Sequence, residues 1–180
     1  IVLMRLNSKI LIIIYKFNWK WELKFMTEEN FYTFNDFTRN INSLLTPSEE
    51  DYVEMIYRLY LKTNSPIRVN DLASSLNVKP PSVTKMIRKL SLKHIIYFEK
   101  YKQIYLLDKG IQLGKFLIER HNTIEKFLKI LNINVNITYE TEKIEHTLSN
   151  ETLNKIIILV DFFERNERIL KFFHDFSRRY

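Results

Sequence analysis

The feature that most constrains the fold of this chain is a pair of short helices predicted over 69–77 and 80–90. Pro80 and Pro81 mark the start of the second helix, because proline is tolerated in the first turn of a helix and not further inside it. Apolar residues then recur at helical spacing, at Val83, Met86, Ile87 and Leu90. Two short helices joined by a tight turn predict a helix-turn-helix.

A longer helix is predicted before this pair and a hairpin after it. Thr46 and the proline that follows it open a helix that extends to about Lys62, with acids near its positive end. The apolar runs 95–98 and 104–107 flank a basic tip, which predicts a hairpin suited to lie along a phosphate backbone. The order helix, turn, helix and basic hairpin therefore predicts a winged helix-turn-helix domain over 46–108.

Positive charge is concentrated on this segment. The net charge of the chain is +7, but residues 1–25 supply +4 of it, so the overall charge is a poor argument for nucleic-acid binding. Between Lys79 and Lys102, by contrast, seven Lys or Arg accompany the single acid Glu99. The residues expected to contact DNA are Lys79, Pro80, Ser82, Thr84, Lys85, Arg88, Lys100 and Lys102. The alternative is a solvated basic face on an ordinary helical domain.

Six side chains with oxygen or nitrogen donors form a second informative pattern. They are Asp51, Glu54, His121, Glu142, Glu145 and His146. The first two and the last three are spaced at one helical turn, so each set is expected to share a helix face. Carboxylates that face one another repel unless a cation lies between them, and carboxylates mixed with imidazole suit Mn(II) or Fe(II). Taken alone, His121 is more often a satisfied core residue than a ligand.

Cysteine is absent from the chain. This excludes disulfides, cysteine-ligated zinc, iron–sulfur clusters and thiol catalysis. It is compatible with a cytoplasmic location. Only two Gly, together with abundant Ile, Leu, Lys and Glu, favour a mainly helical fold, and glycine-rich catalytic loops are not expected.

Four helices are predicted after the hairpin. Asp108 is expected to cap the first, over 109–131, and a short helix that carries the last three candidate ligands follows. The next helix starts near Ser149, and its apolar run 156–160 is continuous, so one face is expected to meet the core and the other a second copy of the chain. A single further amphipathic helix is predicted over 162–180.

Residues 1–45 are predicted to be an N-terminal extension. Their apolar run is too short to cross a bilayer. The chain begins with Ile, whereas Met26 opens a more ordinary sequence, so residues 1–25 are expected to be a non-native segment that comes from reading upstream of the gene or from a misplaced start. The alternative is an arm that binds a membrane surface or a partner through Trp19 and Trp21.

Several motifs occur in one order over residues 46–165. They include Thr46-Pro47-Ser48-Glu49-Glu50-Asp51-Tyr52-Val53-Glu54, Pro80-Pro81-Ser82-Val83-Thr84-Lys85-Met86, Arg120-His121 and Ile144-Glu145-His146. Together they resemble the manganese transport regulators, the Mn-responsive branch of the diphtheria toxin repressor family. The resemblance implies a winged-helix domain joined to a helical metal-binding and dimerisation domain, here 109–180. It also implies a two-metal site between the domains, with the six candidate residues as ligands.

The resemblance also bears on the choice of metal. Iron-responsive relatives use Met at the position of Asp51 and Cys at that of Glu145, whereas both are hard oxygen donors here. The expected function is thus a Mn(II)-activated repressor of manganese uptake genes, with two Mn(II) per subunit, and not an enzyme. It is expected to act as a homodimer on a pseudo-palindromic DNA operator, without membrane attachment.

Three alternatives remain open at this point. An Fe(II)-responsive repressor shares the fold and accepts the same ligands. A binuclear metal hydrolase would need an open coordination position and a general base outside the ligand set, and neither is visible in the sequence. A metal-independent DNA-binding or structural dimer would leave the acids as a solvated face.

Overall fold

The first described helix begins at the capping signal that the sequence predicts. The computed structural model describes residues 45–98 and 103–179. Helix α2 (Pro47–Thr63) starts with a capping box. In it the amide of Glu49 donates to the Thr46 hydroxyl at 3.4 Å, and the amide of Thr46 donates to the Glu49 carboxylate at 2.8 Å.

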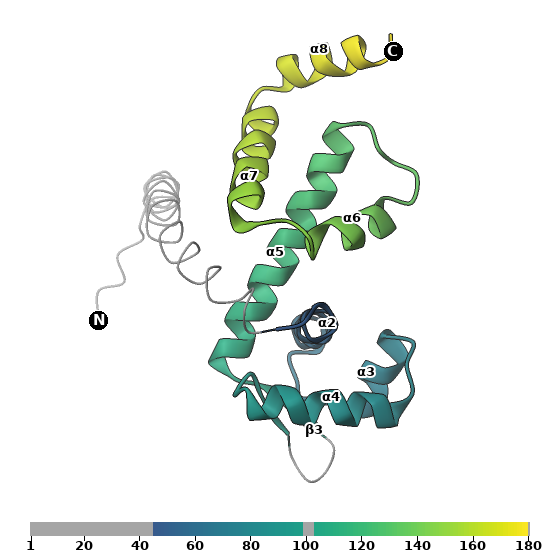
Figure 1. Cartoon of the computed structure of the whole chain (residues 1–180), viewed down its shortest axis with the longest axis vertical. Coiled ribbons are helices and arrows are strands. Elements are labelled where there is room, and N and C mark those ends of the chain that lie inside the picture. The colour runs from purple at the N-terminus through teal and green to yellow at the C-terminus, as the bar shows by residue number, and fades with distance from the viewer. Residues whose placement is uncertain (1–44, 99–102, 180) are drawn as a thin grey trace, which may run out of the picture. The chain divides into compact units, whose positions relative to one another are not determined.

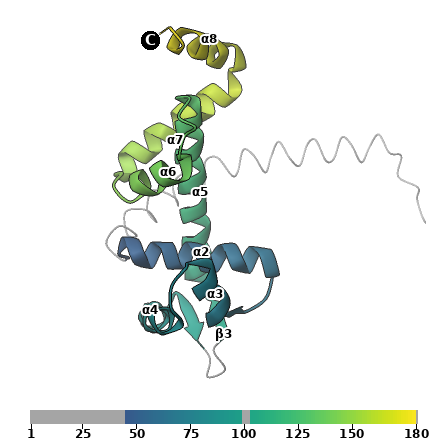
Figure 2. The same cartoon turned by 90° about the vertical axis from the view of Figure 1, so that its right-hand side faces the viewer.

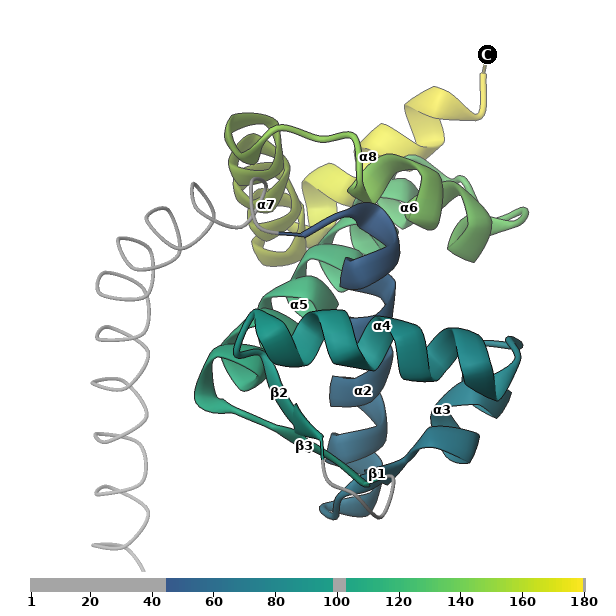
Figure 3. The same ribbon diagram turned by 60° about the horizontal axis from the view of Figure 1, so that its bottom comes forward.

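The predicted helix-turn-helix is confirmed. Helix α3 (Val69–Ser75) and helix α4 (Pro80–Leu92) are joined by a tight turn in which Asn77 has a positive φ of 52°. The apolar stripe of α4 is buried at Val83, Ile87 and Leu90. This burial turns the opposite face of α4 outward (Figure 3).

A small antiparallel sheet completes the winged-helix domain. Its strands are β1 (Ile67–Arg68), β2 (Ile96–Phe98) and β3 (Gln103–Leu106), in the order β1-β3-β2. The hairpin of β2 and β3 is the predicted one. Strand β1 was not predicted, because two residues show no alternation that could indicate a strand. The fold is thus mainly α with a small β wing, as expected.

Helix α5 (Asp108–Ile130) links this domain to the remaining helices, as Figures 1 and 2 show. The prediction that Asp108 caps it is wrong. Asp108 is already the first helical residue, the capping position is Leu107, and no side chain makes a capping hydrogen bond there. The helix instead gains its stability from packing, since it contacts α2, α6 and α7.

Both glycines of the chain lie on α5, where the helix meets its neighbours most closely. A Cβ atom on Gly114 would lie 2.3 Å from Cβ of Tyr57 on α2, and one on Gly110 would lie 2.2 Å from the carbonyl oxygen of Ile95. Neither separation is possible for real atoms. The two glycines therefore allow α5 to approach α2 and the start of the wing.

Three further helices follow: α6 (Ile137–Glu145), α7 (Asn150–Arg165) and α8 (Glu167–Ser177). The prediction of one terminal helix over 162–180 is wrong in its start, because α7 continues to Arg165 and the chain turns at Asn166. The amphipathic pattern runs through this turn without a Gly or Pro to mark it.

Helix α7 buries only one side of its apolar run within the chain. Ile156 and Val160 are buried, and they form a cluster with Ile130. Ile158 and Leu159 are 53% and 39% exposed. Its second apolar face is thus left without a cover in the described part of the subunit.

Two of the predictions concern segments that lie outside the residues described by the structure. The extension up to residue 44 and the tip of the wing at 99–102, with Lys100 and Lys102, are not among the residues described. No helix within 45–98 or 103–179 is long and apolar enough to span a bilayer.

We expect Gly114→Ala to destabilise the protein, because the added methyl group must push Tyr57 and α2 away from α5. The free energy of unfolding should fall by about 1–3 kcal/mol, although Ala is the better helix former. Urea unfolding measures this. Gln112→Ala, at an exposed position of the same helix, is the matched control and should change little. Equal stability of the two variants would contradict the close packing of α5 on α2.

Candidate metal centre

The six candidate ligands meet where α6 reaches the first turns of α2 beside α5 (Figure 1). The two candidates on α2 lie in its first two turns, and His121 lies midway along α5. The other three lie at the end of α6, where His146 is the residue after the last helical one. Residues of α2 thus meet residues of α5 and α6 that lie more than sixty positions later in the sequence.

The six residues divide into two groups, each with one possible ligand atom per residue within 4.8 Å of the others. The open group consists of Asp51, Glu142 and His146. The closed group consists of Glu54, His121 and Glu145. The side chains of Asp51 and Glu142 are 45% and 49% exposed, whereas all three members of the closed group are buried.

Glu145 faces both groups. One of its oxygens, Oε2, lies 3.0 Å from Nδ1 of His121, and the other, Oε1, lies 3.6 Å from Nε2 of His146. Its side chain is only 1% exposed, so both oxygens are directed at protein groups. Glu145 therefore lies between the open group and the closed group.

The two histidines neutralise these carboxylates in the present arrangement. Hydrogen bonds to Asp51 and then to Glu50 raise the pKa of His146 to about 10, against the opposing effects of burial and of Arg120. A hydrogen bond to Glu145 raises the pKa of His121, although burial opposes it. The protonated imidazole of His146 thus supplies positive charge among the clustered acids.

Among the residues that the structure describes, none forms such a hydrogen bond with Glu142. Burial raises its pKa, and the nearby charge of Glu145 raises it further. Nδ1 of His121 lies 3.8 Å from its Oε1, too far for a hydrogen bond. The donor set as a whole, carboxylates and imidazoles without sulfur, fits a hard or borderline divalent cation.

Glu50 and Arg120 support the open group and were not predicted as site residues. The Glu50 carboxylate accepts from Nη2 of Arg120 at 2.8 Å and from Nδ1 of His146 at 2.9 Å. Burial alone would raise the pKa of Glu50, but the hydrogen bond from His146 and the charge of Arg120 outweigh it and lower the pKa. Spacing could not reveal Glu50, because its burial depends on helices distant in sequence.

Two further ion pairs hold the acids of α2. Arg58 donates from Nε and Nη2 to one oxygen of Glu54, at 2.8 and 2.6 Å. Lys93, directly after α4, donates to Glu49 at 2.8 Å. The first turn of α2 is therefore bonded to the end of the predicted recognition helix as well as to the candidate metal centre.

The predicted DNA-contacting residues of α4 lie on its outward face. Exposed side chains are Lys79, Pro80, Ser82, Lys85 and Arg88. Thr84 is half-buried, and its hydroxyl donates to the carbonyl oxygen of Pro80 at 3.1 Å, so it is less available to a base edge than predicted. The remaining two, Lys100 and Lys102, lie in the segment at 99–102 already noted.

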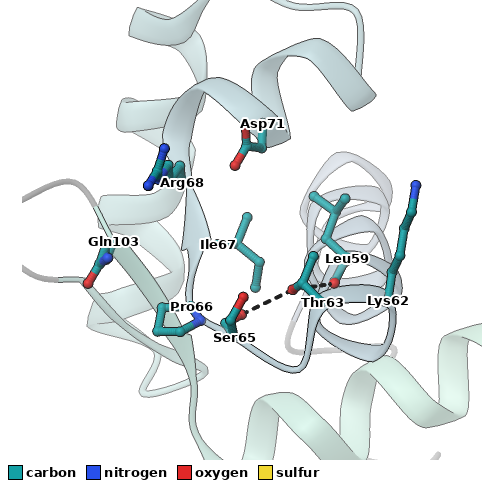
Figure 4. A pocket seen from close by; sticks show the side chains of 9 residues that line it. All are labelled: Leu59, Lys62, Thr63, Ser65, Pro66, Ile67, Arg68, Asp71 and Gln103. Atoms are coloured by element: carbon teal, nitrogen blue, oxygen red, sulfur yellow. Dashed lines mark hydrogen bonds between the residues drawn. The ribbon is translucent and has the colours of Figure 1, made fainter.

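A separate cavity of about 480 Å³ lies between the end of α2, β1 and the start of α3 (Figure 4). Among the residues that line it, Asp71 is the single carboxylate, and none of the six candidate ligands is present. The Thr63 hydroxyl at its wall donates to the carbonyl oxygen of Leu59 at 2.9 Å. The cavity therefore provides neither a carboxylate pair nor a histidine for metal or acid–base chemistry.

Fold and site together define a winged-helix DNA-binding protein with a helical metal-binding partner domain, and comparison with known proteins agrees. Residues 44–104 match the model of the iron dependent repressor N-terminal DNA binding domain. Residues 107–173 match that of the iron dependent repressor metal binding and dimerisation domain. The chain belongs to the iron-dependent repressor family, the metalloregulators related to the diphtheria toxin repressor.

The match to sequence relatives extends over most of the length of each relative. The chain is 39% identical over 135 residues to the HTH-type transcriptional regulator MntR of Geobacillus thermodenitrificans, covering 74% of this chain and 95% of that protein. It is 44% identical over 127 residues to MntR of Listeria monocytogenes, covering 70% and 89%. The protein is therefore a metal-dependent DNA-binding transcriptional regulator.

Solved structures agree with this assignment. The metal-dependent transcriptional regulator MtsR matches with a TM-score of 0.58 at 31% identity, and the manganese regulator SloR with 0.57 at 28%. Each match covers 66% of this chain and 55% of the solved chain, so this chain spans little more than half of those structures. The family consists of transcriptional repressors, not enzymes, which removes the hydrolase alternative.

Binding of a divalent cation at the open group should release protons. A metal needs neutral imidazole, whereas His146, with a pKa of about 10, is protonated at neutral pH. Lowering the pH therefore weakens binding, and affinity should rise by about tenfold per pH unit for each proton displaced, throughout pH 6.5–8.5. Calorimetric titration with Mn(II) in buffers of different ionisation enthalpy counts these protons.

His174→Gln is the matched control for this measurement. His174 bonds to the carbonyl oxygen of Ile130 and contacts none of the six candidate ligands. The variant should release as many protons as the wild type. Mn(II) uptake without proton release at pH 7 would contradict the protonated state of His146.

Proposed function

We propose that this protein is a Mn(II)-activated repressor of manganese uptake genes. The observation that carries the proposal is the convergence of six sulfur-free donors from α2, α5 and α6 into two adjacent groups. The solved structure of the manganese regulator SloR, which is similar to this chain, supports the same metal. A DNA-binding regulator of this kind acts in the cytoplasm.

The grouping of the candidate ligands supports two Mn(II) ions per subunit. One ion would be held by Asp51, Glu142 and His146, and the other by Glu54 and His121, with Glu145 between the two groups. Bound Mn(II) supplies positive charge that offsets carboxylate repulsion. Oxygen donors at Asp51 and Glu145 favour Mn(II), although Fe(II) accepts the same set.

The cations join the two halves of the subunit. In the proposed division, the DNA-binding domain spans 46–108 and the dimerisation domain spans 109–180. Asp51 and Glu54 belong to the former, and the other four ligands to the latter. Binding therefore restricts the motion of the DNA-binding domain and favours one orientation of α4.

A homodimer covers the second apolar face of α7. Ile158, Leu159 and Phe162 are exposed on this helix, and Phe172 and Phe176 on α8 are 73% and 50% exposed. The match to a dimerisation domain supports a second copy as the cover. Two recognition helices about one DNA turn apart then suit a pseudo-palindromic operator.

Asp51→Ala should abolish the response to Mn(II) and leave a folded dimer, because Asp51 is exposed and its loss creates no cavity. Mn(II) should raise the operator affinity of the wild type by about 5- to 150-fold, and that increase should vanish in the variant. Fluorescence anisotropy with DNA from upstream of the gene itself and of nearby transporter genes measures it.

Glu119→Ala, an exposed acid of α5 outside both groups, is the matched control and should respond like the wild type. An unchanged response of Asp51→Ala to Mn(II) would contradict the assignment of Asp51 as a metal ligand. If the wild type binds no stoichiometric Mn(II) in calorimetry, a metal-independent DNA-binding dimer becomes the better description.

Parallel titrations with Mn(II) and, under anaerobic conditions, Fe(II) decide between the two metals. The half-maximal rise in operator affinity should occur at a lower free concentration of Mn(II) than of Fe(II), because both discriminating positions carry hard oxygen donors. Activation by Fe(II) at an equal or lower free concentration would favour the iron-responsive alternative.

A further inference from the structure

A buried ionic network lies behind the open group. Glu50 of α2 and Arg120 of α5 are 6% and 5% exposed, and their side chains are joined at 2.8 Å. Glu50 also bonds to Nδ1 of His146, at 2.9 Å. Three segments from different parts of the chain thus meet at one carboxylate.

Stability alone does not account for this network. Burying an ion pair costs desolvation that its attraction seldom repays, and apolar residues of similar size are often as stable. Nε of Arg120 is buried without a hydrogen-bond partner among the described residues, which adds to the cost. Because the buried ion pair of Glu50 and Arg120 adds little stability, we expect it to serve the neighbouring site.

The geometry at His146 indicates how the ion pair serves that site. An ionised carboxylate only accepts hydrogen bonds, so Nδ1 of His146 must donate to Glu50. The other ring nitrogen, Nε2, then lies 3.1 Å from Asp51 and 3.6 Å from Glu145. The imidazole is held with one nitrogen turned toward the protein interior and the other toward the candidate ligands.

We propose that Glu50 is a positioning residue that directs Nε2 of His146 to the metal, and that Arg120 holds Glu50 in place. This role rests on the proposed function and extends it to two residues that donate no ligand atom. Carboxylates that accept from the second nitrogen of a metal-bound histidine fix its tautomer and its ring orientation. Affinity at the open group therefore depends on Glu50, whereas affinity at the closed group does not.

The competing explanation is a purely structural tether between α2, α5 and the end of α6. Two variants separate it from positioning. Glu50→Gln keeps an oxygen that accepts from Nδ1 but loses the charge, and it should retain most of the affinity for Mn(II). Glu50→Met combined with Arg120→Met removes the acceptor without leaving an unpaired buried charge.

The double variant should bind one of the two Mn(II) ions roughly 10- to 100-fold more weakly and the other unchanged. Calorimetry resolves the two affinities, and far-UV circular dichroism checks the fold. Glu119→Gln is the matched control: it removes one acidic charge from α5, where the exposed Glu119 pairs with Lys115 and belongs to neither group of candidate ligands. Its affinities should equal those of the wild type.

A second measurement needs no variant. Long-range proton–nitrogen NMR of the protein loaded with diamagnetic Cd(II) should find the proton of His146 on Nδ1 and the metal on Nε2. Coordination through Nδ1, or wild-type affinity for both ions in the double variant, overturns the positioning role. A wild type that binds no Mn(II) overturns the proposed function itself, so the two failures are distinguishable.

Discussion

The concentration of carboxylates where α6 meets the start of α2 is the constraint on which this structure depends. Four candidate carboxylates and Glu50 gather around two histidines, and Glu50 is paired with a buried arginine, Arg120. Like charges at this spacing repel in a partly buried site, so the approach of α6 to the start of α2 is favoured when cations or protons offset the repulsion. The contact between these two helices is thus sensitive to the charge in the cluster.

The first turn of α2 is where this dependence reaches the DNA-binding surface. Glu49 bonds to Lys93 at the end of α4, Glu50 to Arg120 of α5, and Asp51 to His146 after α6. Consecutive residues therefore connect the end of α4, the central helix α5 and the end of α6. In the proposed function, metal binding at Asp51 would act on a turn that is bonded directly to the end of α4, and no long pathway is needed between the two.

The accuracy of the sequence predictions differed between elements for physical reasons. The helix-turn-helix was predictable because proline, capping residues and apolar spacing act locally. Strand β1 was missed since a strand of two residues exists only through its pairing with β3. The break between α7 and α8 at Asn166 was missed as well, because the amphipathic pattern passes through it and the packing of Phe173 near Phe163 turns the chain.

The sequence by itself determined the winged-helix class and the outward face of α4, since both follow from residue type and short spacing. It also singled out the six candidate ligands, although His121 was included through the resemblance to the manganese transport regulators and not through its spacing. Only the tertiary structure decided how those ligands divide into an open and a closed group, and that Glu145 faces both. It also decided that Glu50 and Arg120 are buried partners of His146. Burial and contact between α2, α5 and α6 depend on residues far apart in the chain. Local sequence patterns do not reveal such contacts, because they report only on neighbouring residues.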